Sequence, residues 1–551
     1  MRKTHWMGQA ALVISTLLVA GGALAAPAAE NPIRPQAIRA HMNFLADDLL
    51  EGREAGTRGY DIAAKYVAAQ FATLGLEHGA GNGSYFQNVP LRKSTLLAES
   101  ARLTIETRSG RKTYAEGQGV VIYPSLKETD QALQASVVFA GFGVVAPEFG
   151  LDAYADLDVK GRIVALLAGP PPGIPMEAAA HYASQKARTA LSRGALGILL
   201  IYTPAREALF AFDRLRSTIG ATVSWIGPDG QPREGTDSSA YVGIINMTTA
   251  KELFASAPRS LDEVVTEANT RSPKGFPLDA RISLTRRSTH EASVSANVLG
   301  LLPGSDPALS RQIVVISTHL DHVGIGKPVN GDAIYNGALD NAVGVASTIE
   351  VARALVEGSP RPKRTILFAA VTAEEKGLIG SDYFAHHPSV SKDRIVANVN
   401  FDGALALFDF ADIVAYGAEH STLGQSVEQV ADQMGLLLSP DPYPNRGTFT
   451  GSDHYSFVQR GVPAIFLLQG VGKQADGRLG KDVWDSWMST HYHQPSDDMK
   501  QAIDFGACAK FAEVYRRLLL QVANATDAPR WYAGDLFGER FAPDAPKAPR
   551  R

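Results

Sequence analysis

The sequence is poor in cysteine, in long apolar runs and in net charge. Cys508 is the only cysteine among 551 residues, so no internal disulfide can form and packing must stabilise the fold. Beyond the N-terminal region, no apolar run reaches the ~20 residues that a membrane-spanning helix needs. The formal net charge of −4 gives no reason to expect nucleic acid or an anionic membrane as a partner. With 45% hydrophobic residues, the chain is typical of a globular protein of more than one domain.

Residues 1–25 have the pattern of a secretory signal peptide. Arg2 and Lys3 precede an uncharged apolar run over residues 10–25, which ends in the small-x-small triplet of residues 23–25 that signal peptidase cuts. We therefore expect an exported protein, periplasmic or secreted, with no membrane span after cleavage. The alternative is an uncleaved anchor, which the shortness of the run disfavours.

Residues 277–524 alternate strand-like and helix-like segments. Apolar runs at residues 312–318, 365–372, 395–401 and 464–469 predict strands, and helical patterns separate the first three. Amphipathic patterns over residues 34–50 and 60–76 predict two further helices. The fold class that this order predicts is α/β, with a mainly parallel mixed sheet flanked by helices.

Potential metal ligands follow these predicted strands. His319 and Asp321 end the first strand, Glu374 and Glu375 follow the second, and Asp402 follows the third. Because the carboxyl ends of neighbouring parallel strands share one sheet edge, we expect these side chains to converge. Asp340 precedes an apolar set at helical spacing, so it can project toward the same edge: Val343, Val345, Ile349, Ala352 and Leu355.

A further imidazole is expected from residues 490–498, which hold His491 and His493. We choose His493, because Pro495 fixes a turn that can hold its ring still, and regard His491 as a neighbour. Imidazoles and carboxylates without thiolate suit Zn²⁺, with Mn²⁺ or Co²⁺ possible. The number of ligands suits two ions.

The two ions would share one carboxylate. We expect His319 and Asp402 on one ion, Glu375 and His493 on the other, and Asp340 between them. Such a pair activates a water as hydroxide, and a residue beside the ligands must take its proton. Glu374 is our candidate for this general base, and Asp321 is our candidate for the group that hydrogen-bonds the His319 imidazole and fixes its tautomer.

These motifs together resemble the family of co-catalytic dinuclear zinc aminopeptidases. The matching segments include His319-x-Asp321, residues 336–341, residues 374–381, residues 400–402 and residues 492–497. The family includes bacterial leucyl aminopeptidases and aminopeptidase Y and, more distantly, glutamate carboxypeptidase II and transferrin receptors. The resemblance implies a zinc exopeptidase fold, two zinc ions, a bridging Asp340, Glu375 as ligand and Glu374 as base.

A second resemblance lies in the middle of the chain. Motifs of a protease-associated domain are resembled by three segments, at residues 141–147, 158–164 and 193–198. This resemblance implies a β-rich insertion. We expect it to be either a lid or specificity wall beside the site, or an interaction or packing module. The expected organisation is a signal peptide (1–25), an N-terminal part of the peptidase domain (26–130), the protease-associated domain (131–260), the zinc peptidase domain (261–525) and a C-terminal tail (526–551).

The predicted function is that of an exported zinc-dependent aminopeptidase. It would hydrolyse the N-terminal bond of peptides with a free N-terminus, through a hydroxide that bridges the metals. A carboxypeptidase or dipeptidase on the same site is the nearest alternative. A receptor-like binding protein without catalysis is the other, which the presence of every expected ligand and of Glu374 disfavours. Neither the preferred N-terminal residue nor the oligomeric state can be read from the sequence.

Overall fold

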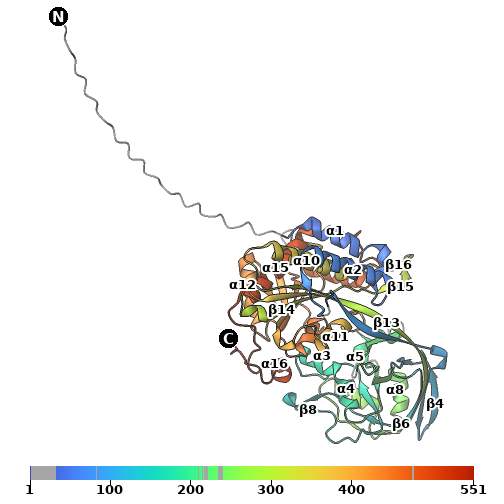
Figure 1. Cartoon of the computed structure of the whole chain (residues 1–551). Coiled ribbons are helices and arrows are strands. Elements are labelled where there is room, and N and C mark those ends of the chain that lie inside the picture. Colours follow the sequence, from blue (N-terminus) through green and yellow to red (C-terminus); the bar gives the residue numbers. More distant parts are fainter. Residues whose placement is uncertain are drawn as a thin grey trace.

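The computed structural model describes residues 1, 33–81, 83–208, 210–213, 215, 221–233, 240–473 and 477–550 (Figure 1). The expected signal peptide, apart from its first residue, lies outside the described residues. Within these ranges no helix combines the length and the apolar character that crossing a bilayer requires.

The larger body is built on a mixed sheet. Its centre is parallel, in the order β17 (Thr365–Val371), β14 (Ile313–His319), β18 (Ile395–Asn400) and β21 (Ala464–Gln469). Strand β19 (Asp412–Tyr416) extends the sheet antiparallel to β21, and β20 (Leu437–Ser439) lies parallel to β19. Every residue of β14 and β17 is buried, which explains the apolar runs over residues 313–316 and 366–371. The predicted α/β class with a mixed sheet is confirmed.

Helices cover both faces of this sheet (Figure 1). One face carries α1 (Pro35–Leu45), α2 (Arg58–Thr73), α10 (Val343–Glu357), α12 (Leu423–Met434) and α15 (Phe505–Asn524). The other carries α11 (Ile379–His386) and α13 (His454–Val458). In α1 the buried residues Ile38, Met42 and Leu45 recur at helical spacing and form the stripe that packs on the core. Cys508 is buried within α15.

A second sheet forms the body that we name the inserted module. Its strand order is β5 (Val120–Ile122), β12 (Tyr241–Ile245), β10 (Gly197–Ile201), β9 (Ile163–Leu167), β6 (Asp130–Phe139), the first part of β13 (Phe276–Leu302), β3 (Arg102–Thr107) and β4 (Gly110–Ala115). Its helices are α3 (Met176–Ser184), α4 (Lys186–Leu191), α5 (Pro204–Glu207), α8 (Met247–Leu253) and α9 (Leu261–Ala268). Strands from before residue 131 and after residue 260 share this sheet, so the predicted division falls inside it.

Strand β13 joins the two bodies (Figure 1). Its 27 residues pair first with β3 and β6, then with β2 (Phe86–Leu96), and last with β17 of the larger sheet. Strand β11 (Ala221–Trp225) pairs with the other edge of β2. A three-stranded antiparallel ribbon therefore connects the module to the sheet that carries the predicted ligands.

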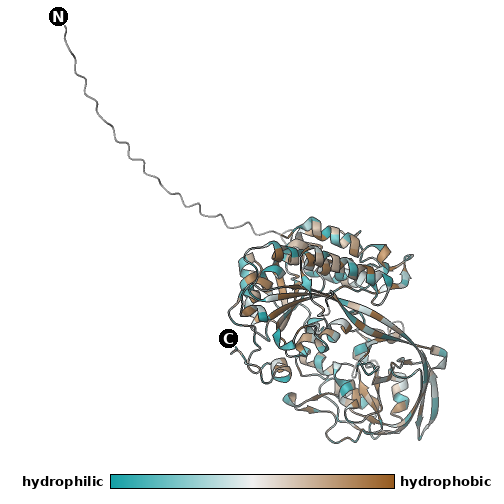
Figure 2. Ribbon diagram, viewed as in Figure 1, coloured by the Kyte–Doolittle hydropathy of each residue, from teal (hydrophilic) through white to brown (hydrophobic). Residues whose placement is uncertain are grey.

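The C-terminal tail packs on the larger body. Trp531 is buried, and its indole Nε1 donates to the Gly461 carbonyl at 2.8 Å. Helix α16 (Leu536–Phe541) follows, capped by the buried Asp535. Figure 2 shows the central strands of the larger body in brown, which marks the apolar interior that these helices and the tail enclose.

Candidate metal centre

Three neighbouring strands deliver the predicted ligands to one edge of the sheet. His319 is the last residue of β14, which lies between β17 and β18. Glu374 and Glu375 follow the end of β17, and Asp402 follows the end of β18. The parallel pairing of these strands thus places all four side chains at their common carboxyl edge.

The first group of ligands centres on His319. Its Nε2 lies 3.0 Å from Asp402 Oδ1 and 3.2 Å from Asp340 Oδ1. Burial disfavours the charged imidazole, but the two carboxylates outweigh it and raise the pKa of His319. One imidazole nitrogen facing two carboxylates in a buried place can hold a cation.

The second group centres on His493. Its Nε2 lies 3.1 Å from Glu375 Oε2 and 3.2 Å from Asp340 Oδ2. Burial opposes the charged ring, but the two carboxylates raise the pKa of His493 to about 10. An imidazole nitrogen that faces two carboxylates suits metal coordination. His491 lies apart from this group, with its Nδ1 against Ser496 Oγ at 2.9 Å.

Asp340 lies between the two groups, with one carboxylate oxygen toward each imidazole. It belongs to a turn over Ala338–Ala342 directly ahead of α10, whose sequence carries the apolar set at helical spacing. Asp497, which is fully buried, holds this turn. Its carboxylate accepts the backbone N–H of Leu339 at 3.0 Å and that of Asp340 at 3.1 Å. Residue 497 closes the same segment that supplies His493, so one segment both provides a candidate ligand and positions another.

Arg53 is a supporting residue that the sequence analysis did not single out. Its buried guanidinium donates to the carbonyls of Leu320 at 2.9 Å, Asn336 at 2.6 Å and Gly337 at 3.0 Å, and also to that of Leu45. These carbonyls flank His319 and Asp340. The Arg53 guanidinium thus connects the two loops that carry His319 and Asp340 to the N-terminal helices. The glycine-rich turn around Arg53 was the only signal in the sequence.

Asp321 does not make the contact that we predicted for it. The His319 Nδ1 lies 3.2 Å from the backbone carbonyl of Asp321, not from its carboxylate. The carboxylate instead accepts the backbone N–H groups of Glu374 at 3.0 Å and Glu375 at 3.3 Å. Because β14 ends at His319, Asp321 lies in the loop beyond the strand, where its carboxylate faces the loop that follows β17 instead of the ring. Burial raises the pKa of Asp321 to about 6.

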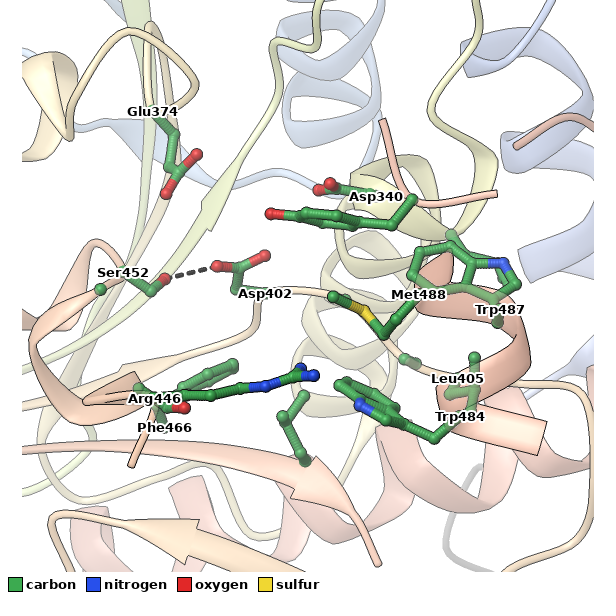
Figure 3. A pocket seen from close by; sticks show the side chains of 17 residues that line it. Asp340, Glu374, Asp402, Leu405, Arg446, Ser452, Phe466, Trp484, Trp487 and Met488 are labelled. Atoms are coloured by element: carbon green, nitrogen blue, oxygen red, sulfur yellow. Dashed lines mark hydrogen bonds between the residues drawn. The ribbon is translucent and has the colours of Figure 1, made fainter. Parts of the chain in front are cut away.

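Glu374 stands beside the ligands and lines the pocket in front of them (Figure 3). Burial raises the pKa of its carboxyl well above the usual range, against the opposing effect of His319 and with help from Asp402. Glu375 turns the other way, where His322 Nδ1 lies 2.7 Å from its Oε1. The hydroxyl of Ser452 donates to Asp402 Oδ2 at 2.5 Å, as drawn in Figure 3.

The pocket in front of the cluster has an apolar wall. Its volume is about 240 Å³, and the side chains opposite the carboxylates are Leu405, Phe466, Leu468, Trp484, Trp487 and Met488. Arg446 reaches across the pocket on the far side of Asp402 from Glu374 (Figure 3). The sequence did not indicate this wall, because its residues lie on segments with no common motif.

Comparison with known proteins places the catalytic part of the chain in a family. Residues 297–519 match the profile of peptidase family M28. The match lies over less than half of the chain, and it confirms the recognition from the motifs.

The curated relatives match only in part. The chain is 26% identical over 231 residues to the probable leucine aminopeptidase 2 of Aspergillus oryzae, which covers 38% of this chain and 42% of that protein. It is 31% identical over 268 residues to leupeptin-inactivating enzyme 1 of Streptomyces exfoliatus, which covers 47% of this chain and 56% of that protein. The chain thus spans about half the length of these relatives.

A solved structure shares the fold over nearly the whole chain. The aminopeptidase from Aneurinibacillus sp. strain AM-1 aligns with 90% of this chain and 96% of its own, with a TM-score of 0.52 and 18% identity. At this identity the likeness shows the fold alone.

Proposed function

We propose that this chain is an exported zinc-dependent aminopeptidase with two metal ions. The observation that carries the proposal is the position of Asp340, whose two carboxylate oxygens each lie 3.2 Å from a different buried imidazole nitrogen. A carboxylate placed in this way can serve two ions at once. The proposal is further supported by the M28 match over residues 297–519.

The donors fit two zinc ions. His319 and Asp402 would hold one ion, Glu375 and His493 the other, and Asp340 both. All are nitrogen or carboxylate oxygen donors, as zinc accepts in catalytic sites. Zinc bound here would lower the pKa of a water to about 7 and polarise the substrate carbonyl.

The chain's own residues orient the substrate and move the proton. Glu374 lines the pocket without belonging to either of the two assigned ligand groups, so it is placed to accept a proton from water and pass it to the leaving amine. The apolar wall would hold the side chain of the N-terminal residue. We therefore propose N-terminal residues with large apolar side chains as substrates.

The test compares leucyl p-nitroanilide with its N-acetyl derivative. We expect hydrolysis only of the free amine, loss of activity with a chelator and its return with zinc. Glu374→Ala should keep two zinc ions per chain and lose at least about a hundredfold in kcat, the lower range for general base catalysis. Glu428→Ala on the exposed face of α12 is the matched control and should behave as the wild type. Full activity of Glu374→Ala would remove this residue from its role.

The position of Arg446 favours a second candidate function. A guanidinium inside the pocket can bind a substrate carboxylate, as a carboxypeptidase or dipeptidase on this site would require. Hydrolysis of N-acetyl dipeptides with a free C-terminus, together with no turnover of the free aminoacyl anilide, would favour this candidate.

A further inference from the structure

A second, larger groove lies in the inserted module next to the metal centre. Its volume is about 910 Å³, near the upper end of the ~300–1,000 Å³ of ligand pockets. It is bounded by the loop over residues 168–174, helix α3, the start of α5 and the loop at Asn445 and Arg446. The metal-centre pocket has only about 240 Å³, so it has room for about one side chain.

Arg446 connects the two cavities. It lines the groove on one side and the metal-centre pocket on the other. Its guanidinium lies 4.4 Å from the ring centroid of Tyr443, which holds the side chain against its own loop. The next residue, Gly447, packs against Ala180 of α3, where an added Cβ would lie 3.0 Å from the Ala180 Cβ. The loop that reaches toward the metals thus also forms part of the groove.

The groove carries positive charge. Its charged lining residues are Lys186, Arg206 and Arg446, and no aspartate or glutamate is among the described residues that line it. The buried ammonium of Lys186 donates to the carbonyls of Leu167 and Gly169, below the loop that forms the groove wall. Glu207 is next to Arg206, but its carboxylate lies 3.3 Å from the backbone N–H of Phe212 and does not line the groove.

We propose that this groove binds the part of the peptide that follows the cleaved bond and selects carboxylates there. This inference rests on the proposed aminopeptidase function, which puts the N-terminal residue in the small pocket and leaves the rest of the peptide to run past Arg446. Two exposed guanidinium groups, at Arg206 and Arg446, supply the charge complementarity. The amides of Asn269 and Asn445 line the same groove and can bind the peptide backbone. The carboxylates can be acidic side chains or the C-terminus of the peptide.

Four pentapeptides separate these two sources. Leu-Ala-Ala-Glu-Glu and Leu-Ala-Ala-Lys-Lys are each made as the free acid and as the C-terminal amide, and leucyl p-nitroanilide serves as a substrate with no residue in the groove. We expect kcat/KM for the acidic free acid to exceed that for the basic amide by about fivefold, as an exposed ion pair allows, and the difference to shrink as salt increases. The two mixed peptides show whether side chains or the terminus carry the preference.

Arg206→Glu is the variant that tests the groove. It should lower or invert the preference for acidic peptides, whereas Arg111→Glu on strand β4, which makes the same change in net charge outside the groove, should keep it. A wild-type preference near one for all four peptides, with leucyl p-nitroanilide still hydrolysed, would overturn the groove proposal alone. An equal effect of both variants would also overturn it.

A binding measurement makes the test independent of turnover. The same peptides, labelled at the C-terminal residue, are titrated with Glu374→Ala, in which they should stay intact, and with Glu374→Ala/Arg206→Glu. Tighter binding of the acidic peptides that is lost in the double variant supports the groove even if no substrate is hydrolysed. Equal affinity for acidic and basic peptides overturns it.

Discussion

Removal of the Asp497 carboxylate tests how the turn before α10 holds Asp340. Asp497 is fully buried and accepts the backbone N–H groups of Leu339 and Asp340 and the side-chain amide of Gln501 at 2.8 Å. Asp497→Ala leaves the two buried backbone donors unpaired, at about 1–3 kcal/mol each. We expect the free energy of unfolding to fall by about 2–6 kcal/mol, a large part of the ~5–15 kcal/mol of a typical protein.

Asp497→Asn is the milder variant, because it keeps one acceptor oxygen. We expect a loss of about 1–3 kcal/mol in stability and a 10- to 100-fold weaker affinity for zinc, as for other groups that orient ligands. Urea denaturation of the metal-free protein measures the first quantity, and titration with zinc against a competing chelator measures the second. Asp498→Asn, next to it and paired with Lys500 at 2.9 Å, is the control. If Asp497→Asn binds zinc as tightly as the wild type, Asp497 does not position the ligand.

Three further predictions follow from the fold and the site. Met488→Ala should lower kcat/KM for leucyl relative to alanyl anilide by about tenfold, because a deleted part of an apolar wall costs a large side chain more than a small one; an unchanged ratio would exclude Met488 from the pocket wall. Zinc at 100 times the Kd of each site should stabilise the protein in thermal denaturation by about 2.7 kcal/mol for each occupied site, and so by about 5.4 kcal/mol for two ions, and Asp340→Ala should show a reduced shift. At the contact of the module with the tail, burial opposes the charged His420, but Asp535 and Glu177, at 2.7 and 2.8 Å, raise its pKa to about 10. Its contribution to stability should therefore be complete below about pH 6.5 and be lost as the pH rises to about 10, and denaturation of wild type and His420→Gln across this range measures the difference.

The parts of the site that could be predicted are those encoded locally. Apolar runs that end in His319, Glu374 or Asp402 identify strands whose carboxyl edges meet, because parallel neighbours place their ends together. The choice of His493 over His491 rested on a nearby proline, and the structure does place His493 against Asp340.

The supporting residues could not be predicted, because their contacts are distant in sequence. Arg53 binds the carbonyl of Asn336, 283 residues away, and nothing local distinguishes it from an exposed arginine in a glycine-rich turn. The role expected for Asp321 was wrong for a related reason. The spacing from His319 places Asp321 just beyond the end of β14, but it does not tell which neighbouring loop packs against the carboxylate there.

The continuous strand β13 limits how the two bodies can move. Together with β2 and β11 it forms a ribbon in which 11 residues of β2, from Phe86 to Leu96, lie in continuous antiparallel register with β13 across the junction. The module could rotate against the larger body only if this ribbon bent or lost its pairing. The ribbon therefore opposes hinge motion. A paired ribbon would keep the groove at a constant distance from the candidate metal centre, and under the proposed function peptide length would then decide which substrates reach both.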